Sequence, residues 1–227
     1  MKLTFFDLDG TLLPIDSDHA FGEFTIARGW ADREEFQRRN DGFYADYVAG
    51  RLDIHAYVAF ATAAWRGRDA ASLAAATEDF LAQVIRPQLH PAAIALVQQH
   101  QNAGDLVAMI TATNDFVTRP IAGLFGIEHL IATELARDAA GRVTGTIHGV
   151  PAFREGKVTR AKAWLAARGQ GLADFERCTF YSDSTNDLPL LERVSHPVAT
   201  NPSLALERVA LQRGCPRENP WRYCCRP

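Results

Sequence analysis

Two aspartates, placed two residues apart near the start of the chain, are the first candidates for chemistry. Asp7 and Asp9 come directly after an apolar run at residues 2–6 that reads as a short strand, and Gly10 and Thr11 follow them. A carboxylate in this position can act as a nucleophile or as a cation ligand, and a glycine lets the backbone approach an anion. An isolated Asp-x-Asp pattern also fits a turn whose side chains bind nearby backbone amides. The later segments of the chain must therefore decide between these readings.

Three further polar segments lie at the ends of predicted elements. Residues 110–114 (Ile-Thr-Ala-Thr-Asn) follow a strand predicted at 106–110, and Lys157 opens a predicted helix. Residues 181–187 follow a strand predicted near 179–182. Ligands of parallel sheets bind beyond the carboxyl ends of the strands. We therefore expect these segments to share one site with the aspartate pair.

The distance between the first two strands predicts an inserted domain. The pattern is helical for about seventy residues after residue 13, whereas an ordinary crossover between parallel strands needs far fewer. Residues 16–87 are therefore predicted to form an all-helical cap. Residues 1–15 and 88–227 are predicted to form the catalytic core, an α/β domain with a Rossmann-like parallel sheet and helices on both faces.

Residues that can cap a helix recur before the apolar stretches of the predicted insertion. We expect Ser17 or Asp18 to cap the first helix, with Asp16 as an alternative cap. The other predicted helices begin after Asp32, Asp53 and Asp69, and the last ends near Ile85. In the core, residues 138–149 are expected to form a hairpin or loop.

Composition limits the classes of protein to consider. The net charge of −3 lacks the basic excess of a nucleic-acid-binding surface, and no apolar run reaches the roughly 18–20 residues that span a bilayer. The N-terminus lacks the pattern of a signal peptide, so we expect a cytoplasmic protein. Cys178 is expected in the core. No function is predicted for the tail from about Gly214, whose cysteines (Cys215, Cys224 and Cys225) lack the spacing of a zinc site.

With all four polar segments in this order, the chain resembles the haloacid dehalogenase superfamily of aspartyl-phosphate hydrolases. It is most similar to the branch that holds phosphoserine phosphatases and bacterial histidinol-phosphate phosphatases. The resemblance implies a helical cap inserted after the first motif and Mg²⁺-dependent hydrolysis of a small phosphorylated metabolite. It also implies that Asp7 is the nucleophile and that Asp9 is the general acid and then the general base.

The resemblance further implies roles for individual residues. Mg²⁺ would be held by Asp7, by Asp183 and by the backbone carbonyl of Asp9. Thr111 and Lys157 would hold the phosphate oxygens, with Asp187 orienting the lysine. The remaining predicted substrate-binding residues are Leu8 and Ala112 through their amides, Gly10, Thr11, Asn114, Asn186 and Asp16. Asn114 is equally a candidate cap for the next helix.

Specificity is expected to come from the cap. Asp16 stands where phosphoserine phosphatases carry an acid that meets the substrate's amino group. The stretch around Tyr57 has no basic residue at the place of their carboxylate-binding arginine, although Arg38, Arg39 or Arg51 could substitute. Phosphoserine and an amine without a carboxylate, such as histidinol phosphate, are therefore both candidate substrates.

Two alternative functions use related chemistry. The acid at position 9 argues against dehalogenation, because a halide leaves without a proton. A receiver-like phospho-aspartate signalling module would use an aspartate, Mg²⁺, a threonine and a lysine. A phosphomutase would use the same core as a phosphatase. The sequence leaves the physiological substrate and the oligomeric state open.

Overall fold

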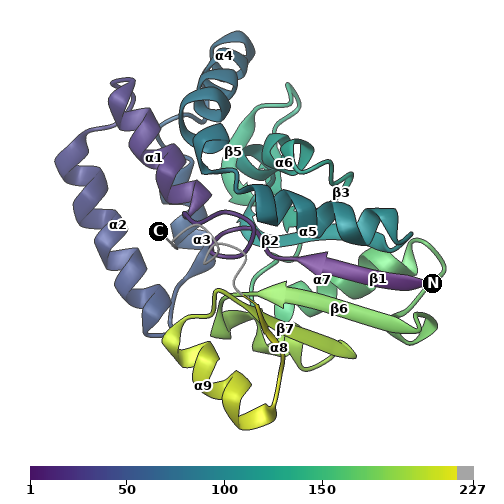
Figure 1. The fold of residues 1–227 in the computed structure, drawn as a ribbon. Helices are drawn as coiled ribbons and strands as arrows, with labels where there is room; N and C mark the ends of the chain where they lie inside the picture. Colours follow the sequence, from purple (N-terminus) through teal and green to yellow (C-terminus); the bar gives the residue numbers. More distant parts are fainter. Residues whose placement is uncertain (219–227) are drawn as a thin grey trace.

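A parallel β-sheet forms the centre of the molecule (Figure 1). The computed structural model describes residues 1–218, apart from the side chains of Val48, Arg217 and Glu218. The strand order is β3-β2-β1-β6-β7-β8. The strands are β1 (Lys2–Phe6), β2 (Leu106–Asn114), β3 (His129–Thr133), β6 (Arg177–Ser182), β7 (His196–Thr200) and β8 (Arg217–Glu218). The first strand of the chain is therefore central, with β2 on one side and β6 on the other.

Successive side chains of the central strands enter two different apolar layers, as a parallel sheet covered on both faces requires. Phe6 packs in one layer with Val97 and Val117, whereas Phe5 packs in the other with Leu165 and Leu190. The helices over the first face are α5 (Pro91–Asn102) and α6 (Asp115–Leu124). Those over the second are α7 (Glu155–Ala166), α8 (Leu188–Leu191) and α9 (Leu204–Arg213). This arrangement agrees with the predicted sheet.

Four helices occupy the segment between β1 and α5: α1 (Ser17–Ala27), α2 (Arg33–Val48), α3 (Ile54–Ala61) and α4 (Ala70–Phe80). Asp32, Asp53 and Asp69 cap the last three, as predicted. Of the three candidate caps for the first helix, it is Asp16, the alternative to Ser17 and Asp18, that accepts the amide hydrogens of the first turn. Helix α4 also ends earlier than predicted, and a π-helical turn continues to Ile85.

The four helices differ in how they pack against the core. The aromatic residues of α1 and α4, Phe21 and Phe80 among them, belong to the same apolar layer as Phe6. Helix α2 instead uses a small separate cluster, in which Phe36 packs with Phe60. A hairpin of β4 (Leu135–Arg137) and β5 (Val143–Ile147) lies in the segment where a hairpin or loop was predicted, and β5 contacts α3.

The carboxyl ends of the strands face the inserted helices. In Figure 1 the arrowheads of β1 and β6 point toward α1, α2 and α3. Strand β2 runs four residues further than predicted, to Asn114, and so carries its polar end to the same edge. β8 pairs with β7 where no strand was predicted, and Cys224 and Cys225 lie outside the described residues. Within residues 1–218, every helix is too short or too polar to cross a bilayer.

Candidate active site

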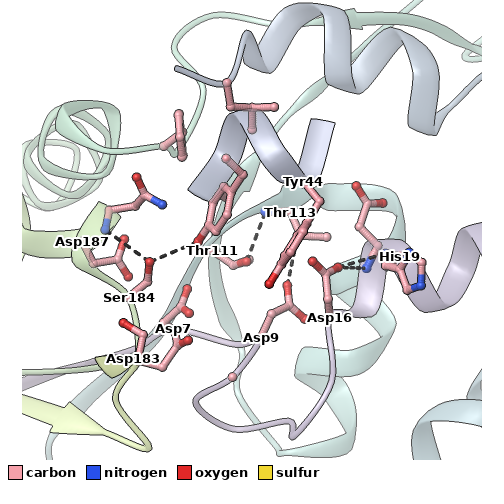
Figure 2. Close-up of a pocket in the computed structure, with 18 of the residues that line it drawn as sticks. Asp7, Asp9, Asp16, His19, Tyr44, Thr111, Thr113, Asp183, Ser184 and Asp187 are labelled. Carbon is pink, nitrogen blue, oxygen red and sulfur yellow. Dashed lines mark hydrogen bonds between the residues drawn. The ribbon is translucent and has the colours of Figure 1, made fainter. Parts of the chain in front are cut away.

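A cavity of about 750 Å³ lies between the ends of the strands and the inserted helices. It is the size of a pocket for a small organic ligand. Figure 2 shows the side chains of Asp7 and Asp183 close together on one side, with Asp9 and Asp16 on the other. The cavity is lined by the following predicted site residues: Asp7, Asp9, Gly10, Asp16, Thr111, Ala112, Lys157, Asp183, Asn186 and Asp187.

Lys157 links the polar segments at the floor of this cavity. Its side chain is 3% exposed, and its ammonium donates to Oδ1 of Asp7 and to Oδ2 of Asp187, each at 2.7 Å. Burial alone lowers the pKa of Lys157, but the carboxylates of Asp187 and Asp7 outweigh that effect and raise the pKa above its ordinary value. The lysine is therefore a permanent positive charge in contact with Asp7.

The carboxylates around Lys157 carry more negative charge than one ammonium can balance. Burial raises the pKa of Asp7 to about 6, an effect that Lys157 opposes and Asp187 reinforces. Burial raises the pKa of Asp183 to about 8, with further contributions from Asp7 and Asp187. A cation placed between Asp7 and Asp183 would reverse these shifts.

Gly10 allows Asp183 to reach this position. Its backbone has a positive φ of 76°, and a Cβ at residue 10 would lie 2.4 Å from Oδ2 of Asp183. Only a residue without a side chain leaves space for the carboxylate here. The space that Asp183 needs thus explains the glycine at position 10, although the two residues lie about 170 positions apart in the chain.

Asp9 is oriented by two hydrogen bonds from different parts of the chain. The amide of Ser17, at the start of α1, donates to Oδ1 at 2.8 Å, and the hydroxyl of Thr113 on β2 donates to Oδ2 at 2.7 Å. Burial, together with the nearby charge of Asp16, raises the pKa of Asp9 to about 8. Each carboxylate oxygen of Asp9 thus accepts one hydrogen bond, and the two bonds fix the orientation of the group.

Three predicted substrate-binding residues do not line the cavity. The side chain of Leu8 is buried in the apolar layer of Phe6. The hydroxyl of Thr11 is buried and has no hydrogen-bond partner among the described residues. Asn114 caps α6 through the amide of Val117, and its amide group donates to Asp18 at 2.9 Å. Asn114 is therefore the cap of α6, which was the alternative to its predicted substrate-binding role.

The donor set fits a hard divalent cation. Two carboxylates, Asp7 and Asp183, and the carbonyl of Asp9 would supply the oxygen ligands that Mg²⁺ prefers, with water completing the shell. Within residues 1–218, no three acidic, histidine or cysteine side chains converge as a ready metal site. The set therefore depends on the main-chain oxygen.

The chain is similar to proteins of known family and known structure. The sequence model of the haloacid dehalogenase-like hydrolases matches residues 4–192, which include every polar segment of the cavity floor. This chain belongs to the haloacid dehalogenase-like hydrolases. The family resemblance and the α/β fold predicted from the sequence are thus confirmed.

Relatives within the haloacid dehalogenase-like hydrolases include named phosphatases. A histidinol-phosphatase from Neisseria meningitidis serogroup C is 44% identical, over 95% of this chain and 97% of the relative. The crystal structure of a protein of unknown function from Bordetella pertussis has a TM-score of 0.91 at 46% identity, covering 97% of this chain and 99% of the other. A substrate-bound phosphoserine phosphatase has a TM-score of 0.66 at 16% identity, covering 97% and 93%, and supports the fold alone.

Several groups in the site of this hydrolase were not predicted from the sequence. Thr113 was assigned no role from the sequence, although its hydroxyl donates to Asp9. Its spacing of two from Thr111 was an available signal, because alternate residues of a strand share a face. Tyr47 and Ser184, which bond each other across the cavity, had no such signal, because the contact joins residues 137 positions apart.

Proposed function

We propose that this chain is a Mg²⁺-dependent phosphomonoesterase that acts on a small phosphorylated metabolite through an aspartyl-phosphate. The observation that carries the proposal is the contact of Lys157 with both Asp7 and Asp187, on the floor of a cavity lined also by Asp183. A phosphate dianion repels a carboxylate nucleophile. A site for it must therefore supply positive charge beside that carboxylate, which is where Lys157 lies.

The first half of the reaction transfers the phosphoryl group to the protein. An oxygen of Asp7 forms a bond to phosphorus while the bond to the leaving alcohol breaks, and Asp9 gives its proton to the departing oxygen. Thr111 and Lys157 hold the phosphoryl oxygens during the transfer. Asp183, Asp7 and the carbonyl of Asp9 would hold Mg²⁺, whose charge would offset that of the phosphate.

The second half releases phosphate. A water molecule gives a proton to Asp9 and attacks phosphorus, and the bond between phosphorus and Asp7 breaks. Asp9 thereby returns to its protonated form, and inorganic phosphate leaves. The hydrogen bonds from Ser17 and Thr113 support this role of Asp9, because they fix the carboxyl group that serves both halves.

We further propose that residues 16–87 act as the cap of this site and that the leaving alcohol carries a positive charge. On the cap side, Asp16, Asp18 and Asp41 line the cavity. Of the described residues, one lysine and no arginine line it. Arg39 lies over the ring of Phe60 instead, and Arg51 pairs with Asp46.

This charge distribution favours histidinol phosphate over phosphoserine, because an amine would meet the cap carboxylates whereas a substrate carboxylate would find no cation there. The 44% identity to a histidinol-phosphatase supports the same choice. The test compares kcat/KM for histidinol phosphate and O-phosphoserine. We expect at least about a hundredfold preference for the former, and a preference for phosphoserine would refute the substrate assignment.

The reaction itself is tested by phosphate release with and without Mg²⁺, in the wild type and in Asp7→Asn. We expect activity to need Mg²⁺ and the variant to fall to background. Wild-type turnover by Asp7→Asn would exclude the nucleophile. Transfer of the phosphoryl group to a second hydroxyl would indicate a phosphomutase. Slow loss of phosphate after reaction with acetyl phosphate, without turnover of esters, would indicate the receiver-like alternative.

A further inference from the structure

Helix α2 contacts the loop that follows β6 through a tyrosine. Tyr47, near the end of α2, places its hydroxyl 3.1 Å from the hydroxyl of Ser184, and it also bonds Asn186. Its ring packs against Phe153, with the ring centroids 6.4 Å apart. Figure 2 shows Ser184 beside Asp183 and Asp187, with dashed lines that mark its hydrogen bonds. Burial raises the pKa of Tyr47, so its hydroxyl stays neutral.

Hydrogen bonds continue from Ser184 to the nucleophile. The amide of Ser184 donates to the hydroxyl of Ser182, which in turn donates to Oδ2 of Asp187 at 2.7 Å. The same oxygen of Asp187 accepts a bond from Lys157, and Lys157 donates to Asp7. A continuous series of hydrogen bonds therefore runs from the hydroxyl of Tyr47 to the carboxylate of Asp7, the proposed nucleophile.

The loop at residues 183–187 carries two carboxylates of the cavity, Asp183 and Asp187. Inside the loop, Ser184 caps the short turn by accepting the amide of Asn186. The hydroxyl that caps the turn is thus the same group that meets Tyr47.

The position of α2 is not fixed by the main apolar layers. Its aromatic residues, Phe36 and Phe43, pack in a small cluster around Phe60. At the other end of the helix, Tyr47 bonds the loop and lies beside Phe153. A displacement of α2 would therefore reach the loop through the hydrogen bond between Tyr47 and Ser184.

We propose that Tyr47 is a positioning residue whose hydroxyl couples α2 to the loop at residues 183–187. With α2 over the cavity, the bond to Ser184 holds the loop so that Asp183 and Asp187 keep the places seen here. Without the bond, the loop relaxes and both carboxylates move relative to Lys157. The consequence for turnover rests on the proposed phosphatase function, whereas the structural coupling does not.

The decisive test is amide hydrogen exchange in the metal-free protein, because it needs no substrate and no turnover. In Tyr47→Phe, which keeps the ring against Phe153, the amides of Ser184, Asn186 and Asp187 should exchange about three- to tenfold faster, the size expected for one neutral hydrogen bond. Amides of β2 should be unchanged. Tyr44→Phe removes a hydroxyl from the same helix that makes no hydrogen bond within the described residues, and it should leave the three amides unaffected.

A double-mutant cycle separates coupling from general loosening. In a Ser184→Ala background, Tyr47→Phe should raise the exchange rate by a smaller factor than in the wild type, because the bond to Ser184 is already gone and only the bond to Asn186 is left to lose. Equal effects of Tyr47→Phe in both backgrounds would overturn the proposal. Unchanged exchange at residues 184–187 in Tyr47→Phe would overturn it as well.

Kinetics supply a second readout in the active enzyme. Tyr47→Phe should lower kcat about three- to tenfold and raise the Mg²⁺ concentration for half-maximal activity by a similar factor, with KM for the ester unchanged. A rise in KM alone would contradict a positioning role. If the wild type hydrolyses no phosphate ester, the proposed function fails, and the exchange experiment still decides the coupling.

Discussion

Thr113 of β2 donates a hydrogen bond to Oδ2 of Asp9 at 2.7 Å, and Asp9 lies three residues beyond the end of the neighbouring strand β1. Since the amide of Ser17 holds the other oxygen, the carboxyl group is fixed between the core and the first inserted helix. The role proposed for Asp9, which gives a proton in one step and takes one in the next, requires the carboxyl group to keep its place through both.

Removing the hydroxyl of Thr113 should therefore impair turnover more than binding. We expect Thr113→Val to lower kcat about ten- to a hundredfold, because a misplaced general acid loses most of its effect. The affinity for inorganic phosphate should be unchanged. Thr113→Ser keeps the hydroxyl and should retain most of the activity, and equal losses in the two variants would show that the methyl group matters instead.

Loss of Lys157 should destabilise the fold as well as abolish activity. Lys157→Met leaves Asp7 and Asp187 buried without their cation, and breaking a buried pair in this way costs about 3–5 kcal/mol. Urea denaturation at pH 7.5 measures the loss. Adding Asp187→Asn to Lys157→Met should recover part of the stability and none of the activity. A Lys157→Met protein as stable as wild type would mean that the pair is not buried in solution.

Asp18 should make the stability of the protein depend on pH. It is buried and bonds the neutral groups of Asn114 and Tyr57, and burial, together with Asp16, raises its pKa to about 7. Between about pH 4 and pH 7 the unfolded chain loses this proton while the folded protein keeps it. The contribution of Asp18 to stability is therefore present below pH 4 and is lost as the pH rises through 7.

Asp18→Asn removes this titration. Its free energy of unfolding, relative to wild type, should rise by about 2–4 kcal/mol between pH 4 and pH 8. Urea denaturation at several pH values provides the measurement. Asp41→Asn, which changes an exposed acid of the same cavity wall, serves as the control and should show no such trend. A pH-independent difference for Asp18→Asn would show that the carboxyl group ionises freely in the folded state.

Gly156 should tolerate no side chain. A Cβ there would lie 1.9 Å from the backbone oxygen of Pro151, so the start of α7 would have to move, together with Lys157. We expect Gly156→Ala to cost about 2 kcal/mol or more of stability and to reduce kcat. Gly123→Ala is the matched control, because a Cβ in that helix meets nothing within 4 Å. It should be neutral or stabilise by up to about 1 kcal/mol.

The meeting of the main polar residues at one cavity could be predicted because they follow directly from a strand or lie in the first turn of a helix. Asp7, Lys157 and Asp183 lie at such positions, and parallel strands bring their ends to one edge whatever the details of packing. The insertion was visible from spacing alone, because a crossover of about a hundred residues exceeds what two neighbouring strands need.

Contacts between distant segments could not be predicted in the same way. Asp18 lies in the first turn of α1, and nothing local indicates that Asn114 and Tyr57 will enclose it. Asp16 became the helix cap because its carboxylate reaches the amides of residues 18 and 19, a choice among three adjacent candidates that short-range preference does not resolve. Tyr47 gives no sign in the sequence of its bond to Ser184.

The place of β1 has a consequence for how the protein is made. This strand is synthesised before both of its neighbours, which are residues 106–109 and 177–181. The central strand therefore has no partner until β2 has been synthesised, about a hundred residues later, and its other edge stays open until β6 is made. Pairing between residues so far apart is also slow to form. The α1–α4 segment is synthesised during that wait, so nascent helices can assemble beside a strand that is still exposed to other sheet edges.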